Sequence, residues 1–121
     1  MASTIKPTLR SKCRDIRFIN EFKEIDKDNK YNIVKLENFM CSAKIKIHDE
    51  YYKLNIKLTQ DYPFAPPIII FETPINHSNV HDGHMCKGLL LTEWSCARTI
   101  NNFLPIIVEL LETNKSVCAK H

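Results

Sequence analysis

The sequence predicts an α+β domain in which one helix precedes a meander of four antiparallel strands and a long helix follows it. Apolar residues recur every three or four positions at the start, alternate with polar residues in the middle, and return to the helical spacing near the end. A chain of 121 residues is long enough for one domain, 1–121, and too short for two. Its 44% hydrophobic and 26% charged residues are typical of a globular protein.

The first helix is predicted to begin near Leu9 and to end before the turn-forming residues 27–30. Pro7 and Thr8 favour a helix start at this point. We expect one stripe of this helix to face the core, because its apolar residues have helical spacing. They are Leu9, Cys13, Ile16, Ile19, Phe22 and Ile25.

Alternating apolar and polar residues predict two half-buried strands, at 41–48 and 52–59. The short polar connection between them makes them antiparallel partners. Residues 31–36 are predicted to form an earlier strand of the same meander. A fourth strand is predicted at 68–72, and its unbroken apolar run 68–71 predicts burial on both faces.

Between the third and fourth strands, the segment 61–67 is predicted to be a rigid elbow. It contains Pro63, Pro66 and Pro67, and proline fixes its own φ and restricts the residue before it. Most of the segment is therefore a structural connector. Phe64 is the residue in it that we expect to remain available to a partner.

A second helix is predicted near the end of the chain from apolar residues at helical spacing. Pro105 bears on where this helix begins. With Thr99 as N-cap, Pro105 lies inside the helix at a cost of about 3 kcal/mol. With Asn102 as N-cap it falls in the first turn, where its missing N–H is harmless. We therefore expect the later start, or a kink. The apolar residues are Ile100, Phe103, Leu104, Ile107, Leu110 and Leu111.

Composition excludes several classes of protein. No apolar run approaches the roughly 18 residues that a membrane span needs, and the first residues lack the pattern of a secretory signal. An odd number of cysteines without a CxxC pair argues against a disulfide framework or a zinc ribbon. We therefore expect free thiols in an intracellular protein. The cysteines are Cys13, Cys41, Cys86, Cys96 and Cys118.

The net charge of +3 is too small to demand a nucleic-acid partner, but the positive charge is concentrated in residues 1–20. There, Asp15 alone opposes five basic residues. This segment is either a solvated helix face or a surface that docks on an acidic protein. Aromatic residues do not interleave with the basic ones, which argues against nucleic acid. The basic residues are Lys6, Arg10, Lys12, Arg14 and Arg17.

The segment 75–91 carries the residues best suited to chemistry. It holds both glycines of the chain, Gly83 and Gly88, and these bracket Cys86. Glycine is needed where the backbone adopts conformations that other residues avoid, or where another chain approaches closely. Cys86 lacks the periodicity of a core residue, and the residues alone leave a reactive thiol and a structural thiol equally open.

Four motifs resemble, in order and approximate spacing, those of the ubiquitin-conjugating (E2) enzymes. They are DYPFAPP at 61–67, HSN at 77–79, GHMC at 83–86 and WSCARTI at 94–100. The resemblance covers about residues 9–114. It implies the fold of that family: an amino-terminal helix on a four-stranded meander, an active-site loop and a long helix. Two further helices are usual in the family, and only seven residues follow Asn114 here.

The resemblance implies a role for each residue of the site. Cys86 matches the cysteine that receives ubiquitin, or a ubiquitin-like protein, as a thioester from an activating enzyme (E1). Asn79 matches the asparagine that stabilises the oxyanion or holds the loop, and His77 matches a histidine that supports the loop. A lysine of a protein substrate then accepts the modifier. No cofactor is implied, because the E1 uses the ATP.

The resemblance also implies docking surfaces. The basic residues Lys6, Arg10, Lys12, Arg14 and Arg17 match the helix that the E1 grips. Phe64 and the turn formed by Ser95, Cys96 and Ala97 match the loops that receive a ubiquitin ligase (E3). The implied protein is a monomer of the cytoplasm or nucleus, with no nucleic-acid or membrane partner, and Trp94 is a packing anchor.

The match has departures, which keep alternatives open. Ser78 and Cys96 stand where the family has proline, Lys87-Gly88 stands where Leu-Asp is usual, and the loop from Asn79 to Cys86 is one residue short. A catalytically inactive E2-like variant that binds ubiquitin or an E3 is the main alternative. A metal site is another, but we predict none because the spacing of its candidate ligands repeats no zinc pairing. Those ligands are His77, His81, His84, Cys86 and Cys96.

Overall fold

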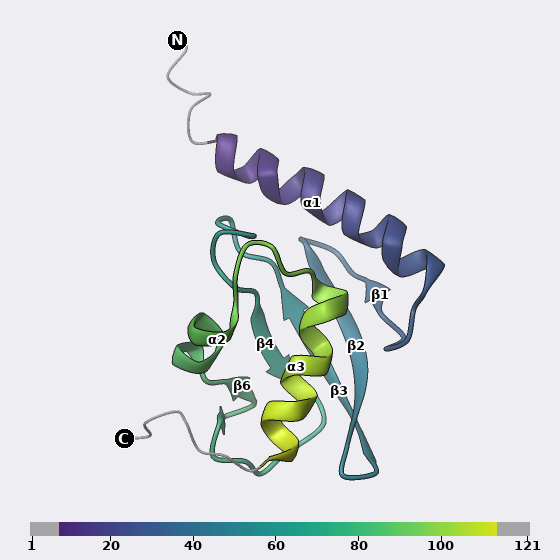
Figure 1. The fold of residues 1–121 in the computed structure, drawn as a ribbon, viewed down its shortest axis with the longest axis vertical. Coiled ribbons are helices and arrows are strands. Elements are labelled where there is room, and N and C mark those ends of the chain that lie inside the picture. The colour runs from purple at the N-terminus through teal and green to yellow at the C-terminus, as the bar shows by residue number, and fades with distance from the viewer. Residues whose placement is uncertain (1–7, 114–121) are drawn as a thin grey trace.

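The computed structural model describes residues 8–113, with side chains from residue 13 onward. Within this range, helix α1 (Thr8–Lys27) precedes the sheet, and helices α2 (Lys87–Glu93) and α3 (Ile100–Glu112) follow it. Figure 1 shows α3 lying over the sheet and α1 crossing beside one end of it. No helix in the described part of the chain is long and apolar enough to cross a membrane.

The sheet confirms the predicted antiparallel meander and extends it. Its order among the described residues is β1-β2-β3-β4-β6-β5, and every neighbouring pair is antiparallel. The earliest predicted strand, 31–36, is reduced to two residues, and the hairpin of β5 and β6 was not predicted. The strands are β1 (Val34–Lys35), β2 (Met40–Ile47), β3 (Glu50–Lys57), β4 (Ile68–Phe71), β5 (Val80–His81) and β6 (His84–Met85).

One face of the sheet forms the core together with α3. Inward residues of β2 and β3, such as Ile45 and Leu54, are at most 1% exposed. In β4, Ile69 and Phe71 are buried, whereas Ile68 and Ile70 on the other face are only partly covered. The prediction that β4 is buried on both faces was therefore wrong, because no described helix covers the outer face of the sheet.

Helix α1 is where the sequence predicts it, but a different stripe of it is buried. Phe18, Phe22 and Ile25 contact the core, together with the carboxylate residue Glu21. Cys13, Ile16 and Ile19 are exposed instead, and the side chain of Leu9 lies outside the described side chains. Two apolar stripes interleave on this helix, and a periodic pattern does not by itself decide which one meets the core.

Helix α3 begins earlier than predicted. Thr99 is its N-cap, with a reciprocal capping box: the Thr99 N–H donates to Asn102 Oδ1 (2.8 Å) and the Asn102 N–H donates to Thr99 Oγ1 (3.3 Å). Pro105 therefore lies inside the helix. The two capping bonds and the burial of residues such as Phe103 and Leu104 offset the cost of the proline.

Candidate active site and docking groove

Main-chain hydrogen bonds hold Cys86 at the point where the β5–β6 hairpin meets α2. Cys86 is the N-cap residue of α2, and its carbonyl accepts from the Leu90 N–H (3.1 Å). Its own N–H donates to the carbonyl of Asn79 (2.8 Å). Both bonds use backbone atoms, so they depend on the path of the chain and not on which side chains stand at Asn79 and Leu90. The residue is 6% exposed.

Asn79 and His77 lie immediately before the hairpin, and His77 connects this loop to α3. The Asn79 N–H donates to His77 Nδ1 (3.0 Å). Since Nδ1 accepts, Nε2 carries the ring proton, and it donates to the carbonyl of Leu111 in the last turn of α3 (3.1 Å). Asn79 itself is fully buried. These contacts are those of residues that brace the loop.

The hairpin turn needs one of the two glycines. Asp82 and Gly83 both have positive φ, 56° and 79°, as a two-residue type I′ turn requires. A Cβ at Gly83 would also lie 3.3 Å from the carbonyl oxygen of Phe71. Gly88 has no such constraint, and a Cβ there would lie 3.9 Å from the Cys86 sulfur. Gly88 thus leaves space beside that sulfur.

The cysteines are in different states. Cys13, Cys41 and Cys96 are free, as predicted, and Cys13 and Cys96 are exposed. Burial, together with the charge of Glu21, raises the pKa of Cys41 to about 12, so this thiol is unreactive at neutral pH. Cys86 is disulfide-bonded in the structure, which contradicts the prediction of a free thiol there.

A groove of about 330 Å³ brings together residues from three segments of the chain. Phe64 of the proline elbow and Cys96 of the turn before α3 both line it, and both belong to the predicted E3 surface. Ile16 of α1 and Phe64 are 57% and 56% exposed, and Ser95 and Ala97 are exposed in the same turn as Cys96. The groove residues are Cys13, Ile16, Arg17, Pro63, Phe64 and Cys96.

Of the five residues predicted to bind the E1, the structure describes the side chains of two, and both make internal contacts. The Arg14 guanidinium lies over the ring of Phe39, 3.9 Å from its centroid. Arg17 donates to the carbonyl oxygens of Cys96 (3.0 Å) and Arg98. Lys6 lies outside the described residues, as do the side chains of Arg10 and Lys12. The E1 assignment stays a prediction.

Arg17 also pairs with a buried carboxylate that the sequence reasoning missed. Glu21 is 5% exposed, and its Oε2 lies 3.1 Å from Arg17 Nε and accepts from the Tyr62 hydroxyl (2.5 Å). Its Oε1 accepts from the Ile100 N–H (2.8 Å). Burial raises the pKa of Glu21, while these donors act in the opposite direction. The i,i+4 spacing of Arg17 and Glu21 is a signal for the pair, but it does not reveal the burial.

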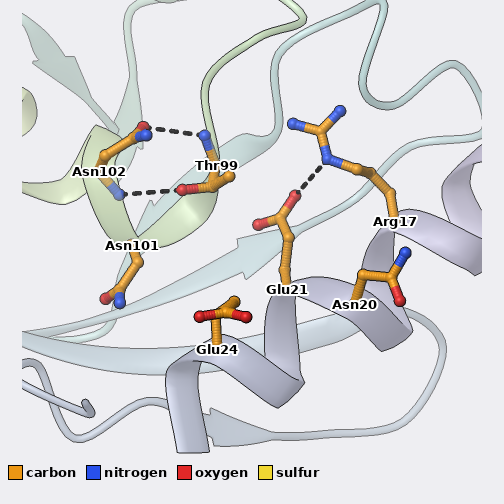
Figure 2. Close-up of a pocket in the computed structure, with 7 residues that line it drawn as sticks. All are labelled: Arg17, Asn20, Glu21, Glu24, Thr99, Asn101 and Asn102. Carbon is orange, nitrogen blue, oxygen red and sulfur yellow. Dashed lines mark hydrogen bonds and ion pairs between the residues drawn. The ribbon is translucent and has the colours of Figure 1, made fainter. Parts of the chain in front are cut away.

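Beside Glu21 lies a cavity of about 400 Å³ between α1 and the start of α3, and its lining residues are all of polar or charged types. Figure 2 shows the Arg17–Glu21 ion pair on one side of it and the Thr99–Asn102 capping box on the other. Glu24 and Asn20 extend from α1 toward the same space. Both oxygens of Glu21 already have donors, so the carboxylate serves the fold rather than a ligand.

The aromatic residues around this network are well packed. Trp94 is buried, and its indole N–H donates to the carbonyl of Pro63 (2.8 Å). Its ring contacts those of Tyr62 and Phe103, at centroid distances of 5.4 and 4.9 Å. This agrees with the predicted role of Trp94 as a packing anchor. Among the described residues, no three His, Cys, Asp or Glu side chains are grouped so as to hold a metal ion.

Comparison with known proteins places these features in one family. The family model described as "Ubiquitin-conjugating enzyme" matches residues 16–121. A probable ubiquitin-conjugating enzyme E2 of Arabidopsis thaliana is 42% identical over 62 residues, which are 50% of this chain and 40% of that relative's length. Another, of Acanthamoeba polyphaga mimivirus, is 32% identical over 111 residues, 79% of this chain and 70% of the relative.

A solved structure shows the same fold. It is described as a ubiquitin-conjugating enzyme from Plasmodium yoelii and superposes with a TM-score of 0.69 at 31% sequence identity. The superposition covers 83% of this chain and 73% of that one. The likeness therefore extends over most of both chains.

Proposed function

Because the chain belongs to the ubiquitin-conjugating enzyme family, we propose that it carries ubiquitin or a ubiquitin-like protein as a thioester on Cys86. The modifier comes from an E1 and passes to a lysine of a protein substrate, with an E3 as docking partner. The chain itself uses no cofactor, since the E1 consumes the ATP. Such a carrier acts in the cytoplasm or nucleus, where E1 and ATP are present.

The observation that carries this proposal is the position of Cys86 at the end of a braced loop. The reduced thiolate of Cys86 attacks the thioester carbonyl on the E1, and the E1 thiolate leaves. The bond broken and the bond formed are both thioesters, so the exchange is close to balanced and reversible. A substrate amine then attacks the new carbonyl, the Cys86 thiolate leaves, and the amine loses a proton.

In this mechanism Asn79 and His77 act on the geometry of the loop. His77 ties the Asn79 main chain to the end of α3, and the Asn79 carbonyl holds the Cys86 N–H. The side-chain amide of Asn79 is the proposed donor to the oxyanion, directly or by holding the loop. A preorganised donor to an oxyanion is typically worth about 10²–10³ in rate.

The docking groove supports the proposed E3 surface. An E3 loop that covers Phe64 and Ile16 removes exposed apolar area from water, which is the main driving force of most protein association. The remaining basic residues of the amino-terminal segment, Lys6, Arg10 and Lys12, are the proposed contacts to an acidic E1 surface.

One observation favours a second candidate, the inactive E2-like module that binds ubiquitin or an E3. Cys86 is disulfide-bonded and 6% exposed, and in that state it carries nothing. The two candidates therefore differ in whether Cys86 reacts once it is reduced. Both would use the docking groove, so binding to an E3 does not separate them.

A thioester assay tests the proposal. The chain is reduced, freed of reductant, and mixed with E1, ATP and ubiquitin, and the products are run on gels with and without thiol reductant. We expect an adduct that reductant removes. Cys86→Ser should convert it into a reductant-resistant ester, and Cys86→Ala should abolish it.

Cys96→Ser is the matched control, because Cys96 is an exposed free thiol that could also react with the E1 thioester. It should form the adduct as the unmodified chain does. The proposal is wrong if the folded, reduced chain forms no adduct with ubiquitin or any ubiquitin-like protein offered with its E1. It is also wrong if the adduct survives in Cys86→Ala. The first outcome would favour the inactive module.

A further inference from the structure

We propose that Glu21 is a positioning residue for the docking groove. It fixes α1, the proline elbow and the turn before α3 in one mutual arrangement, and it does so without lining the groove itself. The inference rests on the proposed function in one respect, namely that the groove receives an E3. It goes beyond it by assigning the groove's shape to one buried carboxylate.

The groove has no single rigid element as its wall. Ile16 comes from α1, Phe64 from the elbow, and Cys96 from the turn between α2 and α3. These segments are more than 30 positions apart from each other in the sequence, so local structure alone does not set their separation. Something that connects all three must do so.

Glu21 makes that connection with its two oxygens. Oε2 holds the elbow through the Tyr62 hydroxyl (2.5 Å), and Tyr62 directly precedes the groove residues Pro63 and Phe64. Oε1 holds the start of α3 through the Ile100 N–H (2.8 Å). The third segment is α1, to which Glu21 belongs.

Glu21 also orients Arg17, which holds the turn directly. The guanidinium is a planar fork, so its Nε contact with Glu21 (3.1 Å) fixes where its other nitrogens point. Those nitrogens donate to the carbonyls of Cys96 (3.0 Å) and Arg98. Arg17 thus reaches the turn from one side while Glu21 holds the residue that follows it.

The apolar contacts of α1 do not specify this arrangement. Phe18, Phe22 and Ile25 attach the helix to the core, but burial of apolar area has no direction and tolerates small shifts of a helix. Hydrogen bonds weaken steeply when they are bent or stretched. The four contacts of the Glu21–Arg17 pair with the elbow, the turn and α3 therefore supply the direction that places α1 against the other two segments, which the Trp94–Pro63 hydrogen bond already joins to each other.

Glu21→Gln tests this with little change of shape. All three partners of Glu21 are donors, and a glutamine has only one oxygen to accept from them. At least one contact is lost, and the amide NH₂ opposes Arg17 or another donor. The substitution should therefore loosen the groove while leaving the apolar contacts of α1 in place.

The experiment combines two measurements on the full chain. Amide hydrogen exchange reports on Phe64 and Arg98, whose N–H groups donate to Asp61 and Ser95. The second measurement is the dissociation constant for an E3 RING domain, chosen from a panel because it binds the unmodified chain. It is obtained by titrating the ¹⁵N-labelled chain, with no ubiquitin attached, with that RING domain. For Glu21→Gln we expect the exchange rate at both amides to rise about tenfold, and the dissociation constant to rise about tenfold as well.

Thr99→Ala is the matched control, since Thr99 lines the same cavity as Glu21 but its hydroxyl, which the substitution removes, accepts from the Asn102 N–H in the capping box. It weakens the start of α3 and should speed exchange at Asn102 with no change in RING binding. Glu21→Asp, which keeps the charge on a shorter side chain, should recover part of the binding lost in Glu21→Gln.

The inference is overturned if Glu21→Gln leaves exchange at Phe64 and Arg98 unchanged, if Thr99→Ala weakens RING binding equally, or if no RING domain binds the unmodified chain. None of these results depends on a thioester, because the chain carries no ubiquitin in any of these measurements. Failure of the thioester assay would therefore leave the role of Glu21 standing, and failure here would leave Cys86 as the proposed carrier.

Discussion

The loop around Cys86 and the docking groove are held by different kinds of contact. In the loop, backbone hydrogen bonds join Cys86 to Asn79 and to α2, and the His77 side chain links the loop to α3. Beside the groove, Glu21 of α1 holds the elbow and the start of α3, and Arg17 of α1 holds the turn. The site of the proposed chemistry thus depends on chain path, and the site of docking depends on particular side chains.

The loop keeps its bonds at one position where the chain departs from the family motif. Ser78 replaces the proline of the family motif in the loop, yet His77 and Asn79 still make their bonds. Backbone bonds survive a change of side chain that keeps the path. The Glu21–Arg17 pair has no such tolerance, because removing one partner of a buried charged pair leaves the other partner without compensation.

Glu21→Leu should produce the largest effect, because it removes the side chain that holds the segments around the groove. It leaves the Arg17 guanidinium, the Tyr62 hydroxyl and the Ile100 N–H without their acceptor. We expect the free energy of unfolding to fall by about 3 kcal/mol, measured by urea denaturation. Glu24→Leu, an exposed position one turn further along α1, should change it by less than about 0.5 kcal/mol. Equal effects at the two positions would contradict the buried network.

Gly83→Ala should have an intermediate effect, because it disturbs the chain path of the loop at the β5–β6 turn. The φ of 79° and the approach of a Cβ to the Phe71 oxygen, 3.3 Å, both oppose a side chain there. We expect a loss of roughly 1–2 kcal/mol in the free energy of unfolding and slower formation of the Cys86 thioester.

Gly88→Ala is the control for Gly83, because it places the same methyl group beside Cys86 from inside α2. Alanine favours a helix over glycine, so stability should stay the same or rise by up to about 1 kcal/mol. Urea denaturation and the thioester assay measure both variants. A loss in Gly88→Ala as large as that in Gly83→Ala would show that the turn geometry is not the cause.

The smallest expected effect is the change with pH in the contribution of Glu21 to the free energy of unfolding. Burial raises the pKa of Glu21 above its ordinary value of 4.5, so the folded chain binds this proton more tightly than the unfolded chain does. The contribution of Glu21 to stability is therefore fully present below pH 4.5 and falls as pH rises through the folded pKa.

Urea denaturation of the unmodified chain and Glu21→Gln from pH 4 to pH 7 measures this contribution. The stability of the unmodified chain relative to the variant should decline with increasing pH. A relative stability that increases with pH would mean that the donors around Glu21 lower its pKa instead. His77 and the loop are common to both proteins and cancel in the difference.

Much of the fold could be predicted because apolar residues recur with a period of two in the long strands and of about 3.6 in the helices. Strands β2 and β3 follow the alternation of residues 41–48 and 52–59 to within two residues. The β5–β6 hairpin was missed although Asp82-Gly83 is a strong turn signal, since its strands are too short to show alternation. Helix α3 starts at Thr99 because capping and burial outweigh the local cost of Pro105.

The candidate site divides in the same way. The motifs place Cys86, Asn79 and His77 in one loop, and Phe64 and Cys96 in one groove, as the resemblance implied. The role of Glu21 could not be predicted, because it depends on donors 41 and 79 positions away in sequence. Nor could the inward direction of Arg17, since a basic residue among basic residues looks like part of a solvated face.

The two edges of the sheet are unusually short. The long strands β2 and β3 lie inside the sheet, while β1 at one edge and β5 at the other contain two residues each. Strand β1 itself therefore presents few unpaired N–H and C=O groups to a neighbouring molecule, although Val34 on it is exposed. It pairs only with Cys41 and Ser42 of β2, so the part of β2 beyond Ser42 is the longer stretch of strand at that edge and the place where edge-to-edge growth into fibrils would begin.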